Sequence, residues 1–168
     1  MSPEKTIARI FGMTDDIWAR HANPWSVWTR YTTLPLLAVS VWSRAWIGWW
    51  AAVPVILSIL WVYLNPRVFS KSETTNNWAS KSVLGERVWL NRKTIPVPSR
   101  HYRMIYLAVA VSAIGAVVSV YGLIALELWP TIAGILIVII GKTWFLDLMV
   151  KLYEEMIDNN PDYRSWMY

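Results

Sequence analysis

The chain has 168 residues, of which 55% are hydrophobic and 16% are charged, and it carries a net charge of +5. Soluble domains usually contain about 25% charged residues, so this composition indicates a membrane protein. The sequence has no cysteine, which excludes disulfides, thiolate metal sites and cysteine nucleophiles. No nucleic-acid-binding motif accompanies the basic charge, and we therefore expect no nucleic-acid partner.

The distribution of basic residues predicts both an architecture and its orientation. Of the sixteen Lys and Arg residues, only Arg44 lies outside three polar blocks at 1–30, 65–103 and 142–168. Positively charged loops resist translocation across a membrane, so these blocks should face the cytoplasm. We predict an all-α membrane protein whose four transmembrane helices form two hairpins, with both termini on the cytoplasmic side.

The N-terminal part should contain an interfacial segment followed by the first hairpin. Residues 1–23 form the amphipathic segment, and residues 24–64 form the hairpin. The apolar patches of the segment are Ile7, Ile10 and Phe11, and Ile17 and Trp18. Asn23 suits the N-cap of the first spanning helix, and Pro24 suits its first position. Arg30 lies within that helix, and we expect its side chain to extend to the cytoplasmic headgroups.

The remainder should contain a basic cytoplasmic loop at 65–103, a second transmembrane hairpin at 104–157 and a C-terminal tail at 158–168. Residues 78–93 are dense in Trp, aliphatic and charged side chains, and we expect them to pack on the membrane surface. Small residues recur at helical spacing in both helices of the second hairpin, which predicts close contact between them. These residues are Ala108, Ser112 and Ala116 in one helix and Gly134 and Gly141 in the other.

Polar residues that should converge at the cytoplasmic face form the candidate functional cluster. Its members are His21, Asn23, Asn65, Arg67, Glu86, Arg87, Asn91 and Arg92. We expect Glu86 to pair with Arg67 or Arg92, since a carboxylate among so many basic residues should not remain solitary. Ordinary roles as helix caps and phosphate contacts would also explain the cluster. His21 and His101 lack a spaced partner, so we assign no metal or cofactor site.

Three motifs carry a resemblance to a known family. They are HANPWSVWTRY at 21–31, LNPR at 64–67 and WASKSVLGERVWLNR at 78–92. The chain resembles a group of small, uncharacterised prokaryotic membrane proteins with several spans, over about residues 13–157. That resemblance implies no activity and no catalytic residues. It implies only which motif positions to test: His21, Asn23, Pro24, Trp25, Asn65, Pro66, Arg67, Glu86, Arg87, Trp89, Asn91 and Arg92.

Two classes of function fit these features. The first is a non-enzymatic protein of a prokaryotic cell membrane that binds lipids, with anionic lipids as partners, or that serves as an accessory subunit of a membrane complex or homo-oligomer. The alternative is a small interfacial enzyme that acts on a lipid or isoprenoid at the cytoplasmic face. The lack of polar residues within the spans disfavours a small-molecule transporter. No catalytic constellation is recognisable, and the sequence identifies no cofactor.

Overall fold

The computed structural model describes residues 12–168, and each regular element in this range is a helix. The first described helix, α2 (Asp15–His21), begins at Thr14, whose hydroxyl accepts a hydrogen bond from the backbone N–H of Ile17 at 3.4 Å. Thr14 is therefore the N-cap of α2. The predicted apolar patch at residues 7–11 lies outside the described residues.

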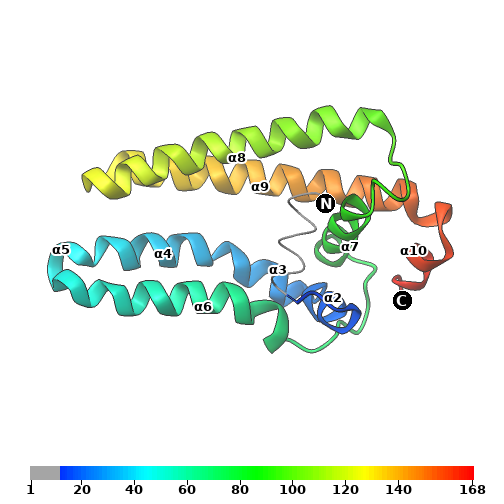
Figure 1. Ribbon diagram of the computed structural model, residues 1–168, viewed down its shortest axis with the longest axis horizontal. Coiled ribbons are helices and arrows are strands. Elements are labelled where there is room, and N and C mark those ends of the chain that lie inside the picture. The colour runs from blue at the N-terminus through cyan, green and yellow to red at the C-terminus, as the bar shows by residue number, and fades with distance from the viewer. Residues whose placement is uncertain (1–11) are drawn as a thin grey trace.

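The first helical pair consists of α4 and α6, which lie side by side and run in opposite directions (Figure 1). The elements of this region are α3 (Pro24–Tyr31), α4 (Thr33–Trp42), α5 (Arg44–Ile47), the 3-10 helix η1 (Gly48–Ala51) and α6 (Ala52–Val68). Asn23 caps α3 as predicted, because its side chain accepts from the N–H of Trp25 at 2.9 Å. The break between α3 and α4 follows from Pro35, whose ring conflicts with a carbonyl four residues earlier in a continuous helix.

The second helical pair consists of α8 (Ser99–Ala125) and α9 (Leu128–Met156), and the two helices contact each other along their length (Figure 1). A Cβ added at Gly134 would overlap the backbone of Ser119, and one added at Gly141 would lie 2.5 Å from the hydroxyl oxygen of Ser112. The predicted contact is therefore confirmed for Ala108 and Ser112, which face Gly141, but not for Ala116, which is exposed; Gly115 and Ser119 face Gly134 instead. Because backbone lies against backbone at these positions, only glycine fits them.

The loop helix α7 (Trp78–Leu90) packs against α9 and forms most of the core with it. Val83, Val88 and Trp89 of α7 are buried. The expectation that this segment covers the membrane surface was wrong, because its apolar face packs against protein. Gly85 makes this approach close, since a Cβ there would overlap the backbone of Met149. The chain then continues through η2 (Ile157–Asn159) and α10 (Pro161–Ser165).

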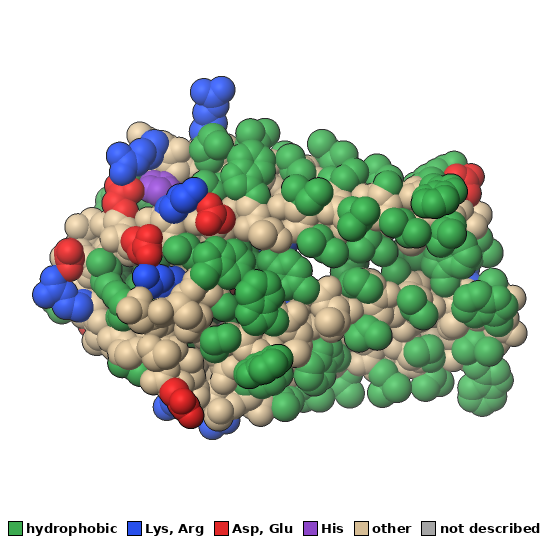
Figure 2. Space-filling view, turned by 180° about the vertical axis from the view of Figure 1, so that it is seen from behind, with side chains coloured by type: hydrophobic (Ala, Val, Ile, Leu, Met, Phe, Trp, Pro, Cys, Tyr) green, Lys and Arg blue, Asp and Glu red, His purple; other side chains and the backbone are tan. Residues whose placement is uncertain are grey.

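Three helical stretches of the described chain are long and apolar enough to cross a membrane: 24–68, 99–125 and 128–159. Stretch 24–68 folds back on itself at α5 and η1, so α4 and α6 lie in one layer and α8 and α9 in another (Figure 1). Hydrophobic side chains cover most of the length of both layers, and charged side chains gather at one end (Figure 2).

We call the charged end, which holds α2, α7 and α10, the α7 end, and the opposite end the turn end. Between these ends the two pairs contact each other sparsely. At the turn end Arg44 joins them, because its Nη2 donates to the carbonyl oxygens of Leu123 at 2.5 Å and Ile124 at 2.8 Å. A cation at the C-terminus of α8 also complements the helix dipole.

Candidate functional site

A cavity of about 460 Å³ lies between the two helical pairs at the α7 end. Its wall is largely apolar and comes from α2, α3, α6, α7, α8 and α9, with Val62 of α6 and Val109 of α8 on the side of the apolar helices. An imidazole, a guanidinium and a carboxylate interrupt this wall, on His21, Arg30 and Glu86. The cavity is therefore apolar along its helices and polar at one end.

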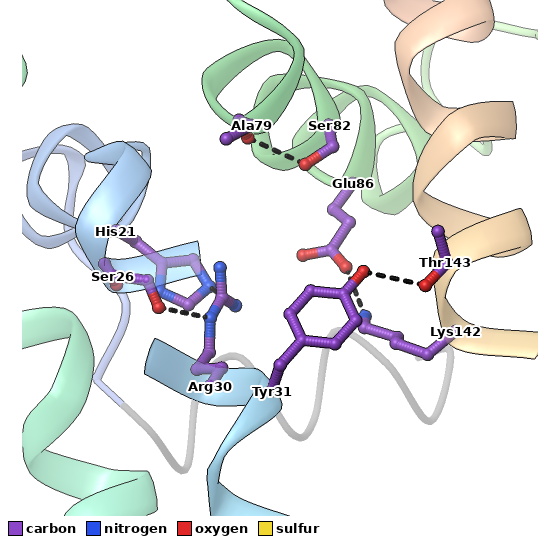
Figure 3. A network of polar contacts seen from close by, with 9 residues as sticks. All are labelled: His21, Ser26, Arg30, Tyr31, Ala79, Ser82, Glu86, Lys142 and Thr143. Carbon is purple, nitrogen blue, oxygen red and sulfur yellow. Dashed lines mark hydrogen bonds and ion pairs between the residues drawn. The ribbon is translucent and has the colours of Figure 1, made fainter. Parts of the chain in front are cut away.

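His21 and Arg30 form one side of the polar end (Figure 3). His21 is the last residue of α2, and its Nε2 lies 2.7 Å from Nη1 of Arg30 on α3. A guanidinium can only donate, so Nε2 accepts, and a neutral imidazole must carry its proton on Nδ1. That Nδ1 is buried without a hydrogen-bond partner. Burial, reinforced by the positive charge of Arg30, lowers the pKa of His21 to about 3, so the ring is neutral at neutral pH.

The Arg30 guanidinium is only partly satisfied by the protein. Its Nε donates to the carbonyl oxygen of Ser26 at 3.1 Å, and its Nη1 donates to His21. Its Nη2 is buried and has no hydrogen-bond partner in the part of the chain that the structure describes. This geometry corrects the expectation that Arg30 extends to the headgroups, because hydrogen bonds to α2 and α3 hold the side chain against the cavity.

Glu86 of α7 forms the opposite side of the polar end and pairs with Lys142 of α9, with 2.8 Å between Oε1 and Nζ (Figure 3). The predicted pairing with Arg67 or Arg92 was therefore wrong, because the packing of α7 on α9 brings a lysine to this carboxylate instead. Burial raises the pKa of Glu86, but the positive charges of Lys142 and Arg30 outweigh burial and lower that pKa. Glu86 is thus ionised, and Lys142 balances its charge.

The predicted Asn65 lies beside the cavity and joins α3 to α6. It is fully buried, its Oδ1 accepts from the Ser26 hydroxyl at 2.9 Å, and its Nδ2 donates to the Thr29 hydroxyl at 2.8 Å. Asn23, besides capping α3, donates through Nδ2 to the carbonyl oxygen of Ser70 at 3.1 Å. Both Asn-Pro motifs therefore help to fix α3, the helix that carries Arg30.

The other predicted residues lie outside the cavity wall. The guanidinium of Arg67 lies 3.9 Å from the ring centre of Tyr63, and that of Arg92 lies 4.2 Å from the ring centre of Trp89. Arg87 pairs with Asp15 and lies over the ring of Trp166, and Asn91 caps the end of α7. The structure thus brings His21 and Glu86 to the cavity wall and places the remaining six residues of the cluster outside it.

Arg30 and Lys142 are site residues that the predicted cluster left out. Arg30 also lines a second cavity of about 100 Å³ with Tyr31 and Lys142, so its side chain stands between the two cavities. The Tyr31 hydroxyl lies 3.1 Å from the Thr143 hydroxyl and connects the first pair to α9 (Figure 3). The signal for Arg30 was its place in the same motif as His21, but its position within an apolar helix suggested a lipid contact instead.

Comparison with known proteins identifies the family. The model of a family of unknown function, DUF6653, matches residues 2–166. The chain belongs to this family. Neither the curated proteins nor the solved structures contain a match. Membership in DUF6653 carries no activity with it, and residues 12–168 contain no group of three or more His, Asp or Glu side chains placed to hold a metal ion.

Proposed function

We propose that this protein is a four-span membrane protein of a prokaryotic cell that binds a lipid-like amphiphile in the cavity between its helical pairs. The observation that carries this proposal is the form of the cavity, which has about 460 Å³, an apolar wall and a charged end. Ligand sites are typically apolar with a few polar groups that fix orientation. An apolar chain fits the wall, and a polar head fits the end that holds His21, Arg30 and Glu86.

The lengths and surfaces of the helices support four crossings. Helix α8 has 27 residues, or about 40 Å at 1.5 Å per residue, which exceeds a hydrocarbon core of about 30 Å. The fold-back of 24–68 supports a crossing by each of its two arms. Exposed tryptophans surround the turn end, as expected at a membrane interface; they are Trp46, Trp49, Trp50 and Trp129. The basic residues at the α7 end favour a cytoplasmic location for that end.

A route from the bilayer into the cavity supports a membrane ligand over a water-soluble one. The two pairs contact each other sparsely, and an opening is visible between the layers in the apolar half of the molecule (Figure 2). Val62 and Val109 line the cavity and are also exposed on the apolar helices. A chain that lies between the pairs would therefore pass from lipid to cavity without crossing a polar surface.

Native mass spectrometry of the protein released from nanodiscs tests this proposal. The Val109→Trp variant adds a large ring at the cavity wall, and we expect it to lose most of the lipid that remains bound to the wild type. The matched control is Val117→Trp, at a strongly exposed position of the same helix that does not line the cavity. Equal occupancy in all three proteins would overturn the proposal.

An enzyme acting on the bound amphiphile is a second candidate. The neutral imidazole of His21 and the carboxylate of Glu86 at one end of an apolar cavity favour it, because such groups can transfer protons. Lipid extracts from cells that express the wild type or Glu86→Gln separate the two candidates. An enzyme changes the chemical identity of the lipid in a Glu86-dependent way, whereas a binding protein leaves it unchanged.

A further inference from the structure

We infer that the amphiphile carries an anionic oxygen head, a carboxylate or a phosphate, and that Arg30 binds this head. The inference rests on the proposed lipid-binding function and names the chemical class of its ligand. Two observations support it. Hydrogen-bond donors at the polar end of the cavity lack acceptors among the described residues, and the charged side chains around them carry a net positive charge.

The unused donors lie on Arg30 and His21. A guanidinium has five N–H donors, and among residues 12–168 only Ser26 and His21 supply acceptors, to Nε and Nη1. Within the same residues, neither the buried Nη2 of Arg30 nor the buried Nδ1 of His21 has a hydrogen-bond partner. Buried donors without acceptors are costly, and more so when the group is charged. An oxygen-rich ligand head that reached Arg30 would supply the acceptor that Nη2 lacks.

The charge balance selects an anionic head over a neutral one. Lys142 compensates Glu86 at 2.8 Å. Among residues 12–168, no carboxylate forms an ion pair with Arg30 within 4 Å, and the imidazole of His21 is neutral. Two cations, Arg30 and Lys142, thus face the single carboxylate of Glu86, which leaves a net positive charge at this end of the cavity. Arginine binds carboxylates and phosphates through paired hydrogen bonds, which makes these two heads the natural complement.

The remaining wall defines the other half of the ligand. Beyond the polar end, the cavity is lined by apolar side chains, including Val62, Ile105 and Val109. A free phosphate or a small carboxylic acid would leave this wall without a partner, whereas an attached alkyl or isoprenoid chain would cover it. The class that fits both halves is a single anionic head on an apolar chain.

A series of ligands with one chain and different heads tests the inference. We would measure binding of dodecyl phosphate, laurate, dodecanol and dodecyltrimethylammonium to the full chain in nanodiscs of zwitterionic lipid, at about pH 8, where both anionic heads are ionised. We expect at least one anionic ligand to bind about tenfold or more tightly than the alcohol, and the cation to bind most weakly. The better of the two anions identifies the head as phosphate or carboxylate.

Variants at Arg30 test whether this residue binds the anionic head group. Arg30→Gln should remove the preference for the anion over the alcohol, and Arg30→Lys should restore part of it. The control Arg103→Gln removes an exposed cation from α8 and should leave the preference intact. Should Arg30→Gln fail to fold, the head-group series on the wild type still decides the matter. Equal affinity for dodecanol and both anions, or tighter binding of the cation, would overturn the inference, whereas failure of every amphiphile to bind would overturn the proposed function itself.

Discussion

The imidazole of His21 has an environment far from that of a free side chain. It is held between α2 and the Arg30 guanidinium, and the lowered pKa of about 3 keeps it neutral. Protonation would place a second cation beside Arg30 in a site with little solvent. The hydrogen bond from Nη1 to Nε2 would also be lost, because a protonated imidazole has no acceptor.

Acid should therefore destabilise the fold through His21. Below its ordinary pKa of 6.5, this residue binds a proton in the unfolded chain but not in the folded one, so stability falls as pH falls from 6.5 toward 3. Glu86 adds to the loss only below its ordinary value of about 4.5, since its pKa is also lowered. Between pH 6.5 and pH 4.5 we expect the wild type to lose about 2–3 kcal/mol of unfolding free energy. Over the same range we expect the His21→Gln variant to lose much less.

Denaturant unfolding at a series of pH values measures this difference. The His101→Gln variant removes the other imidazole of the described chain, which pairs with Glu155 at 2.8 Å, and should keep the loss that depends on His21. Parallel pH profiles for the wild type and His21→Gln would contradict a neutral, buried His21.

At the scale of elements, local signals predicted much of the fold but not the site. The capping chemistry of Asn23 predicted the start of α3. The small residues that face Gly141 predicted the contact between α8 and α9. By contrast, the partner of Glu86 depends on how α7 packs on α9, and Lys142 lies 56 residues away in sequence. The burial of α7 against α9 could not be predicted from the sequence either. The apolar face of an amphipathic helix can pack against protein or against a membrane, and its sequence pattern is the same in both cases.

A larger side chain on α9 should destabilise the protein only where it faces α8. Gly134→Leu places a side chain where backbone atoms of Ser119 already lie, and we expect a loss of about 1–3 kcal/mol in unfolding free energy. Ala133 is the neighbouring residue and is exposed, so Ala133→Leu is the matched control and should be close to neutral. Thermal unfolding in one detergent gives the comparison, and identical midpoints for the two variants would show that α8 and α9 separate there.

At the scale of the whole molecule, the charged end and the apolar layers predict an orientation in the membrane. The native chain has no cysteine, so single introduced cysteines report their own position. We expect Trp49→Cys and Glu127→Cys, both at the turn end, to react with an impermeant thiol reagent added to the outside of intact cells. Ser165→Cys at the α7 end should react only after the membrane is opened. Reaction of Glu127→Cys only after opening would reverse the orientation.

The Arg44 bridge has a mechanical consequence for the exchange of a bound molecule. The two layers are tied together at the α7 end by the contact between Tyr31 and Thr143, and again at the turn end by two hydrogen bonds from Arg44. Layers tied at both ends cannot swing apart like the halves of a hinge. Widening of the gap between them would require the helices to bow outward, a collective motion of microseconds to milliseconds. The residence time of a ligand would then depend on how easily the four helices bend, and not on the strength of the Arg44 or Tyr31 contact alone.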